Sequence, residues 1–445
     1  MIGMNKRLTK LGLLSTAISC GLTAAGCSSG DTASSRPPSA EVPKSTASKP
    51  TENLQPVTLN VFNGRSSEVG NYWDQLLTEP LKKKYPHITI NQIKGDITKV
   101  VAEGTPIDVY IMAHVDLGNF IQLDLADDIE PLMKTHNMSL SRFDPNVIQT
   151  LRAISPDGKK LLGIPFYLQF TTLYYNKDIF DILGVPYPKD GMTWDDTIQL
   201  AKKVSATHDG KAYLGFKADQ AQRMADPLGI TSVDPKTNKA SVNNDKYKKV
   251  FQLTQQFFSI PGNGAKDEKD VNAGPVNLFA KDKALAMYFG VNRFPTLQKA
   301  DVNWDIAQSP YYPDKPNYGG IIDSFMAGVS KTSKHKDDAF RVLEVFTSDE
   351  NQLYSSRALG YVSPLLDKRM QEQFGAELDF LKGKNVQAIF KSKNAIPDPM
   401  SIYRNDSLTI LLEEHGKYIM GQQDVNTALK TAEERINKKI ESLAH

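Results

Sequence analysis

Residues 163–180 read GIPFYLQFTTLYYNKDIF, and this stretch is the clearest guide to the fold. Its first part, residues 163–175, is apolar and aromatic and predicts one long strand. Thr193 follows soon after and can cap a helix. The apolar side chains of that helix recur at the spacing of a core-facing stripe, at Trp194, Ile198, Ala201 and Val204. A strand followed by a helix is the repeating unit of an α/β fold.

The same alternation of strands and helices occurs along the rest of the chain. We expect further strands at residues 57–62, 87–90, 108–112, 213–216, 284–289, 302–307 and 321–329. A helix after the first strand has one apolar face, made of Trp73, Leu76, Leu77, Leu81 and Tyr85. At the C-terminus Asp424 can cap a helix whose apolar stripe comprises Val425, Leu429, Ala432, Ile436, Ile440 and Leu443. Because the alternation extends over residues 57–445, we expect α/β architecture with two lobes rather than one core.

The overall charge excludes binding of nucleic acid by a basic surface. The 445 residues include 53 Lys and Arg against 51 Asp and Glu, a formal net charge of +2. Lys6, Arg7 and Lys10 lie in the first 26 residues, which contain no acidic residue. The remainder therefore has 50 basic against 51 acidic side chains, and the slight basicity belongs to the N-terminal segment.

The N-terminus has the pattern of an export signal. Three basic residues precede a short apolar stretch, residues 11–26, that is rich in Ser, Thr, Ala and Gly. A bilayer-spanning helix needs about 20 strongly apolar residues, so a transmembrane anchor is the weaker interpretation. Residues 22–27, LTAAGC, resemble a lipobox, in which small residues precede a cysteine that is diacylated; Ala24 departs from the usual Leu. We therefore predict a signal peptide over residues 1–26 and a lipid anchor at Cys27.

The second cysteine, Cys20, lies inside the apolar stretch and is the competing candidate for modification. The chain after Cys27 has no cysteine, which excludes disulfide scaffolds, zinc ribbons and cysteine nucleophiles. Residues 28–56 are rich in Ser, Pro and Thr and have almost no side chains that could form a core. We expect residues 27–56 to be a flexible tether behind the lipidated cysteine.

The chain lacks the common catalytic motifs. It has no Gly-x-Ser-x-Gly elbow, His-Glu-x-x-His pair, Walker A loop or Gly-x-Gly-x-x-Gly sequence. Glycosidases use two carboxylates, and acidic pairs occur at 127–128, 195–196, 337–338, 413–414 and 433–434. Most of these pairs fall on predicted helices or near helix starts, where acidic side chains also favour the helix dipole. We therefore expect no enzyme; a surface-tethered glycan-active enzyme and an adhesive lipoprotein remain alternatives.

Several motifs, in their order along the chain, resemble the extracellular solute-binding proteins of ABC importers, family 1, which includes maltose-binding protein. The most specific are Ile164-Pro165-Phe166, residues 173–180 and residues 192–196. The stretch 104–109 matches an approach to a central strand, although Ile107 interrupts the family's Pro-Asp pair. Matches farther along include Phe279, Lys283, Ala286-Met287, Gly290, residues 319–329, Ala339-Phe340, Leu343, residues 428–430 and residues 436–438. The resemblance covers almost the whole body after the tether.

The resemblance implies a two-lobed periplasmic-binding-protein-like fold of type II, with a ligand cleft between lobes joined by crossing strands. The first lobe would be residues 57–165 plus 321–349, and the second 166–320 plus 350–445. Hinge closure would capture a sugar or oligosaccharide, which is then delivered to membrane permease subunits. The protein would be a monomer on the extracellular face of the cytoplasmic membrane, in a Gram-positive bacterium. No cofactor, metal or nucleic acid is expected, and a non-sugar solute remains an alternative.

Family positions suggest which residues face the solute. In the first lobe these are Asn63, Arg65, His114 and Asp116. At the crossing strand, alternation would place Tyr167 and Gln169 on one face. In the second lobe they are Gln220, Gln222, Arg223, Asn292, Arg293, Phe294, Tyr403 and Arg404. Such a cleft at strand ends can present both polar and aromatic side chains to a sugar.

Each position also has an ordinary structural interpretation. Tyr167 could fill a core, and Arg65 and Arg293 could be surface charges. His114 and Asp116 could form a metal pair, but two ligands without others make this the weaker hypothesis.

Two departures from the family bear on the identity of the solute. Sugar binders of the family often place Trp just after the cleft glycine, where this chain has Asn292, and the helix near Leu408 is aliphatic. Both features argue against a maltodextrin site. Arginines near the predicted cleft suggest an acidic or heavily hydroxylated sugar, because Arg pairs with carboxylates through two hydrogen bonds.

Overall fold

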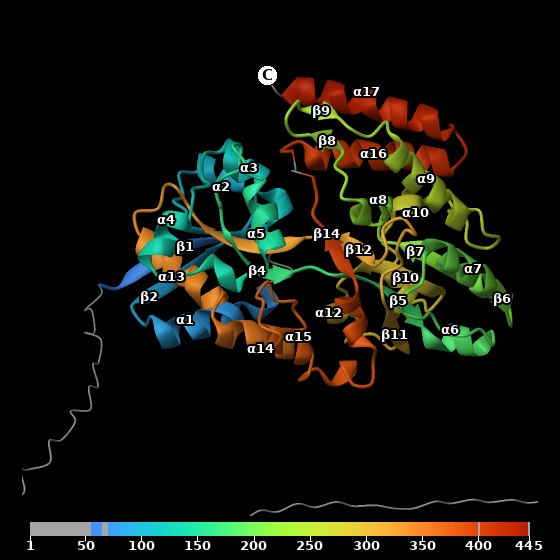
Figure 1. The fold of residues 1–445 in the computed structure, drawn as a ribbon, viewed down its shortest axis with the longest axis horizontal. Coiled ribbons are helices and arrows are strands. Elements are labelled where there is room, and N and C mark those ends of the chain that lie inside the picture. The colour runs from blue at the N-terminus through green and yellow to red at the C-terminus, as the bar shows by residue number, and fades with distance from the viewer. Residues whose placement is uncertain (1–54, 65–69, 399–400, 444–445) are drawn as a thin grey trace, which may run out of the picture. The chain divides into compact units, whose positions relative to one another are not determined.

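The computed structural model describes residues 55–64, 70–398 and 401–443. The predicted signal peptide, Cys27, the predicted tether up to residue 54 and Arg65 lie outside the described residues. The remaining chain contains two five-stranded sheets (Figure 1). The first has the order β2-β1-β3-β13-β4, with bounds Ile88–Ile93, Val57–Asn63, Val109–Ala113, Ser324–Val329 and Ile164–Leu168. The strand β1 is parallel to β2 and β3, whereas β13 is antiparallel to β3 and β4.

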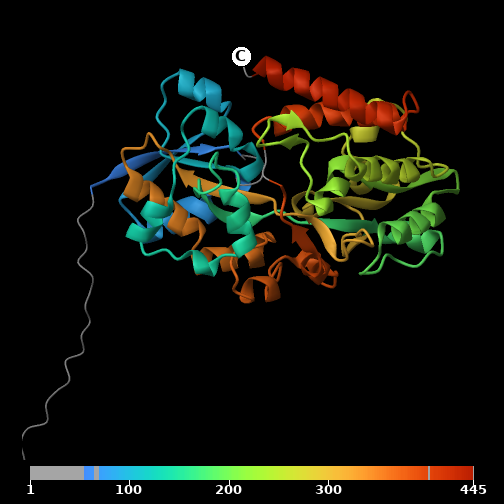
Figure 2. The ribbon, with the colours of Figure 1, turned by 45° about the horizontal axis from the view of Figure 1, so that its top comes forward.

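The second sheet has the order β11-β5-β10-β7-β6, with bounds Trp304–Ala307, Thr171–Asn176, Leu285–Val291, Lys211–Ala218 and Ala206–His208. Here β10 is parallel to β7 and antiparallel to β5. Its helices include α6 (Lys177–Ile182), α7 (Trp194–Val204), α8 (Ala221–Ala225), α9 (Asp245–Phe258), α16 (Arg404–Ile419) and α17 (Val425–Leu443). Figure 2 shows α16 and α17, in red, lying along each other. The α/β fold class with two sheets is confirmed.

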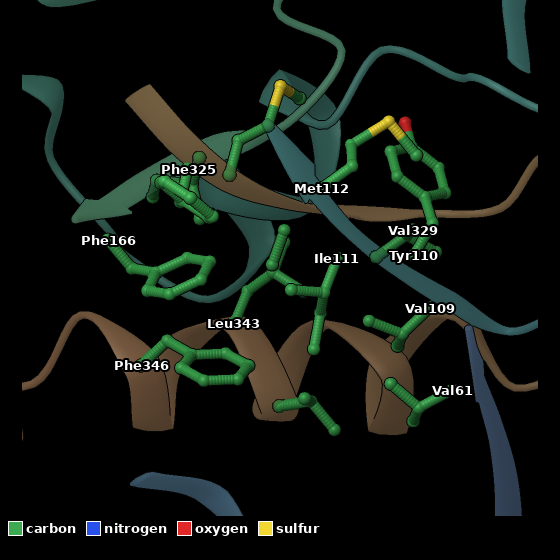
Figure 3. Packing of buried hydrophobic residues seen from close by; sticks show 14 of the residues in the cluster. Val61, Val109, Tyr110, Ile111, Met112, Phe166, Phe325, Val329, Leu343 and Phe346 are labelled. Carbon is green, nitrogen blue, oxygen red and sulfur yellow. The ribbon is translucent and has the colours of Figure 1, made fainter. Parts of the chain in front are cut away.

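Each sheet has its own buried core. In the first, Leu343 and Phe346 of α13 (Lys336–Phe346) point toward the sheet residue Ile111 and its neighbours (Figure 3). Phe346 stacks on Phe166 of β4 with ring centroids 4.6 Å apart. A second helix on this core, α14 (Asp349–Leu359), contributes Leu359. The second core centres on Trp194, which is 2 % exposed.

Two of the strands expected to be continuous are each divided, and this division connects the sheets. The expected strand 163–175 is β4 and β5, which belong to different sheets and are separated by Gln169 and Phe170. The expected strand 321–329 is likewise interrupted at Ile322 and Asp323, between β12 (Tyr318–Ile321) and β13. A third connection contains β14 (Lys393–Ala395), which pairs with β12. We call these three stretches the crossing segments. Nearly every residue on both sides of these breaks is buried, so the apolar composition does not mark where one strand ends and the next begins.

Local signals read from the sequence agree with the helix ends. Thr193 caps α7, and its side chain and that of Asp196 form a reciprocal capping box. Asp424 accepts the N–H groups of Asn426 and Thr427 at the start of α17. One expectation is wrong: Leu443 is 45 % exposed, so the buried stripe of α17 ends at Ile440, in the turn before the helix ends.

The expected helix after β1 is irregular. It comprises a 3-10 turn (Gly70–Tyr72), a π-helical turn (Asp74–Thr78) and α1 (Glu79–Lys84). Leu76, Leu77 and Leu81 are nevertheless buried as predicted. Within the described part of the chain, no helix has the length and apolarity needed to cross a bilayer.

Candidate functional site

His114 lies directly after β3, in the short 3-10 turn His114–Asp116, and is 1 % exposed. The backbone N–H of Ser324 donates to its Nδ1 at 3.1 Å, and the carbonyl oxygen of Ser324 lies 3.3 Å from the same nitrogen. Burial lowers the pKa of His114, and the nearby Asp323 carboxylate opposes this shift only in part. The imidazole is therefore neutral, and its Nε2 is buried with no hydrogen-bond partner among the described residues.

Asp323, in a crossing segment, connects His114 to the second sheet's side. Its Oδ1 lies 3.7 Å from Nδ1 of His114, and its Oδ2 lies 3.9 Å from Nη1 of Arg223. Arg223, in α8, also donates to Oδ2 of Asp226 at 3.1 Å, while Gln222 donates to the other oxygen of Asp226 at 3.1 Å. The guanidinium thus lies between two carboxylates, which balance its charge within the protein.

Arg293 is held in a second network of the same kind. Its Nη2 donates to Asp219 at 2.9 Å, and its Nε donates to the hydroxyl of Tyr288 at 2.6 Å. Its backbone N–H donates to the hydroxyl of Tyr174 at 3.0 Å. A guanidinium with these partners positions the loop after β10. It is less available than an unpaired arginine for binding an anionic solute.

Tyr167 forms a direct contact between the two sheets' sides. Its hydroxyl donates to Oε1 of Gln169 at 2.5 Å and accepts a hydrogen bond from Nδ2 of Asn292 at 3.3 Å. Its ring stacks on Tyr361 with centroids 4.2 Å apart. Tyr167 is only 2 % exposed, so in this conformation its ring packs against protein and its hydroxyl links β4 to the loop after β10.

Among the candidate arginines that the structure describes, Arg404 has the fewest partners. Its Nη1 donates to the side chain of Asn405 at 3.3 Å, and no carboxylate of the described residues lies within 4.0 Å of it. Asn405 in turn lies 3.5 Å from Asp116. Arg404 lines a narrow pocket beside the crossing segments, which we call the inner pocket. Its other polar lining residues are Gln222, Thr231, Ser232 and Asp398.

The structure brings most of the predicted residues to this crossing region. Hydrogen bonds, ion pairs and the inner pocket connect His114, Asp116, Tyr167, Gln169, Gln222, Arg223, Asn292 and Arg404. Asn63 ends β1 and is 2 % exposed. That these residues contact a solute remains a prediction.

Three other candidates are placed less favourably. Phe294 is 1 % exposed and packs among core aromatic rings, and Tyr403 belongs to the second core. Gln220 lines a separate small pocket with His415. The described residues contain no group of three or more His, Cys, Asp or Glu side chains arranged to hold a metal ion.

Several residues of this region were not predicted from the sequence. Asp219, Asp226 and Asp323 are the carboxylate partners of the arginines, and Tyr361 provides the stacked ring. A usable signal existed for Asp323, because it follows the apolar pair Ile321-Ile322 immediately before a buried strand. Acidic residues at such interruptions of apolar runs are candidates for a site.

With this geometry established, comparison with known proteins identifies the family. The sequence model of the bacterial extracellular solute-binding proteins matches residues 63–353. The chain belongs to this family. The match runs from the last residue of β1 into the first half of α14, and therefore includes the other strands of both sheets and the first two crossing segments.

Individual relatives are more distant. The chain is 25 % identical over 369 residues to the sn-glycerol-3-phosphate-binding periplasmic protein of Brucella melitensis, covering 74 % of this chain and 79 % of the relative. A corresponding Rhizobium meliloti protein is 24 % identical over 309 residues, covering 64 % and 69 %. These relatives of the solute-binding family are periplasmic by name.

Solved structures support the fold of this solute-binding protein. The ABC substrate-binding protein of Listeria monocytogenes in complex with cycloalternan has a TM-score of 0.72 and 21 % identity, covering 87 % of this chain and 99 % of that one. An open conformation of a Rhizobium etli sugar transporter has a TM-score of 0.66 and 19 % identity, covering 85 % and 99 %. At these identities the comparison establishes the two-lobed fold alone.

Proposed function

We propose that this solute-binding protein is the capture component of an ABC importer and closes around its solute by hinge motion. The observation that carries the proposal is the concentration of polar side chains at the crossing segments. Asp323 lies in one crossing segment, between His114 of the first sheet's side and Arg223 of the second. A solute bound there would touch both lobes and so favour their closed arrangement.

We propose a sugar or oligosaccharide as the solute. Hydroxyl groups both donate and accept hydrogen bonds, and the inner pocket has amide, hydroxyl, carboxylate and guanidinium groups together. The names of several structural neighbours, which include complexes with cycloalternan and tagatose, favour the same class. An acidic sugar has less support, because Arg223 and Arg293 are already paired with carboxylates.

Arg404 supports a phosphorylated polyol as the second candidate solute. It has no carboxylate partner within 4.0 Å among the described residues, and the curated relatives are named for sn-glycerol-3-phosphate. A guanidinium in such surroundings can bind a phosphate through two hydrogen bonds. A phosphorylated polyol is therefore the non-sugar alternative that a specific residue, Arg404, supports.

Calorimetric titration of the purified protein tests both candidates. We would titrate neutral sugars, uronates and sn-glycerol-3-phosphate in turn, and repeat the active titration with Arg404→Ala. Saturable binding of a neutral sugar supports the first candidate, and saturable binding of the phosphate alone supports the second. Binding of neither class, together with binding of a peptide or polyamine, would exclude both.

We propose further that Cys27 is lipidated and anchors the protein to the outside of the cytoplasmic membrane, as in Gram-positive bacteria. The LTAAGC sequence supports this, and two acyl chains suffice for stable attachment. The protein would act there as a monomer with membrane permease subunits. Incorporation of labelled palmitate by the wild type, its loss in Cys27→Ser, and its persistence in Cys20→Ser form the test.

We also propose that the protein is not an enzyme. The acidic pairs that suggested glycosidase chemistry have structural partners: Asp196 caps α7, and Glu414 is paired with Lys417 and Arg435 while fully buried. Incubation with oligosaccharides should therefore release no shorter products; release of reducing ends would contradict the proposal.

The lobe boundaries remain a proposal as well. The expected division gives residues 57–165 plus 321–349 to the first lobe and 166–320 plus 350–445 to the second. Leu359, Tyr361, Leu365 and Met370 belong to the first sheet's core. We therefore propose that the first lobe's last segment continues to about residue 370.

A further inference from the structure

A groove on the second lobe leads away from the inner pocket. The inner pocket and this groove share three lining residues, Ile230, Thr231 and Asp398. Beyond them the groove is lined by Ser241 and by Asn244, Asp245 and Lys246 at the start of α9. We call it the outer groove. The shared lining places the two spaces next to each other.

The two spaces differ greatly in size. The inner pocket has a volume of about 10 Å3, enough for one water molecule, because the crossing segments lie close to α8 and α16. The outer groove has about 360 Å3, which is within the range of small-molecule sites. In the conformation with the Tyr167–Asn292 contact, therefore, the outer groove has room for a sugar unit and the inner pocket does not.

The outer groove offers donors and acceptors in near balance. The side chain of Asn244 is fully used: its amide donates to the carbonyl of Ser241, and its oxygen accepts the N–H groups of Lys246 and Tyr247. The carboxylates of Asp245 and Asp398 and the ammonium of Lys246 remain exposed, with no side-chain hydrogen bond to the described residues. Two carboxylates and one ammonium disfavour a polyanion and suit a neutral polyhydroxylated chain.

We propose that the solute is a neutral oligosaccharide of at least two units, and that its outer units lie in the outer groove. Its inner unit would lie beside Arg404 when the lobes separate enough to admit it, and the chain would leave over the start of α9. Ile230 supplies apolar surface where the two spaces join. This inference rests on the sugar-binding function proposed above and adds chain length, charge and direction to it.

Calorimetric titration with sugars of one to five units tests the proposal. The probes are malto-, xylo-, manno-, cello- and galacto-oligosaccharide series. In the series that binds, affinity should rise from one unit to about three and then level off, as additional hydrogen bonds form in the groove. Each groove hydrogen bond should contribute between about twofold and tenfold in affinity.

Two groove variants and one control separate the inner from the outer contacts. Asp245→Asn and Lys246→Ala should each weaken binding of the three-unit sugar by about fivefold and leave binding of the one-unit sugar within twofold. Arg404→Ala should weaken sugars of every length. Lys236 is an exposed lysine in the turn between β8 (Val233–Asp234) and β9 (Lys239–Ala240), and Lys236→Ala should change the binding of neither sugar.

Each result has a definite meaning. The assignment of the outer groove would be contradicted if sugars of one and three units bound with equal affinity. It would also be contradicted if the groove variants weakened binding of both sugars equally. In either case the sugar-binding function would still stand. If no sugar of any length binds, both the proposed sugar-binding function and the assignment of the outer groove are wrong. Preference for a uronate series over neutral sugars would overturn the assignment of a neutral chain.

Discussion

At the residue scale, buried carboxylates position the arginines of the crossing region. Asp226 is 1 % exposed and accepts hydrogen bonds from Arg223 and Gln222. Replacing Asp226 by Asn should lower the free energy of unfolding by about 1–3 kcal/mol, because Arg223 loses a charged partner. Urea denaturation measures this loss.

The matched control is Asp301→Asn, which removes an exposed carboxylate paired with Lys283. Exposed pairs contribute about 0–1 kcal/mol, so this variant should be close to wild type. Equal losses in the two variants would contradict the special role of Asp226.

A residue-scale pH effect belongs to His415, which is fully buried in α16. Its Nε2 donates to Thr254, whose own hydroxyl donates to the carbonyl of Phe251, so Nδ1 is unprotonated. Burial lowers the pKa of His415 from 6.5 to about 3. Below pH 6.5 the unfolded chain binds a proton that the folded chain does not, so stability falls with decreasing pH, by about 2 kcal/mol at pH 5.

This loss can be measured by thermal or urea unfolding between pH 7 and pH 5. His415→Gln removes one of the two buried histidines whose pKa is lowered, the other being His114, and should reduce the slope in this window, although it lowers stability at pH 7 as well. His208→Gln changes a half-exposed histidine and should keep the wild-type dependence. An unchanged slope in His415→Gln would contradict the assignment.

At the element scale, the start of α7 depends on one side chain. The hydroxyl of Thr193 accepts the N–H of Asp196, and the Asp196 carboxylate accepts the N–H of Thr193. Thr193→Ala should lower the free energy of unfolding by about 1 kcal/mol. The measurement is urea denaturation, with the exposed Thr237→Ala as a control that should lose less than about 0.5 kcal/mol.

At the scale of the whole molecule, the Tyr167 hydroxyl links the two sheets' sides. Tyr167→Phe keeps the stacked ring but removes the hydrogen bonds to Gln169 and Asn292. Without solute, the variant should populate the open arrangement more, which small-angle X-ray scattering would detect as a larger radius of gyration. Tyr187→Phe removes a hydroxyl that donates to Asp181 in the same lobe, and it should leave the scattering unchanged.

Local patterns predicted most of the elements. The capping residues Thr193 and Asp424, the buried faces of α7 and α17 and most strand positions follow from spacing along the chain. Divided strands were missed for a physical reason: Gln169 and Phe170 interrupt the hydrogen-bond ladder, not the apolar pattern, so β4 and β5 read as one strand.

The sequence by itself determined the α/β class, the helix ends and the near-neutral charge, because these depend on neighbours a few residues away. Only the tertiary structure decided which charges meet. Asp219 is 74 residues from Arg293, and His114 is 210 residues from Ser324. Their contacts exist because β7 and β10 are neighbours in the second sheet, as β3 and β13 are in the first, although each pair is far apart along the chain. No local pattern in the sequence predicts such long-range contacts. They matter for the site because Arg223 and Arg293, which the sequence suggests are available to a solute, are paired with carboxylates.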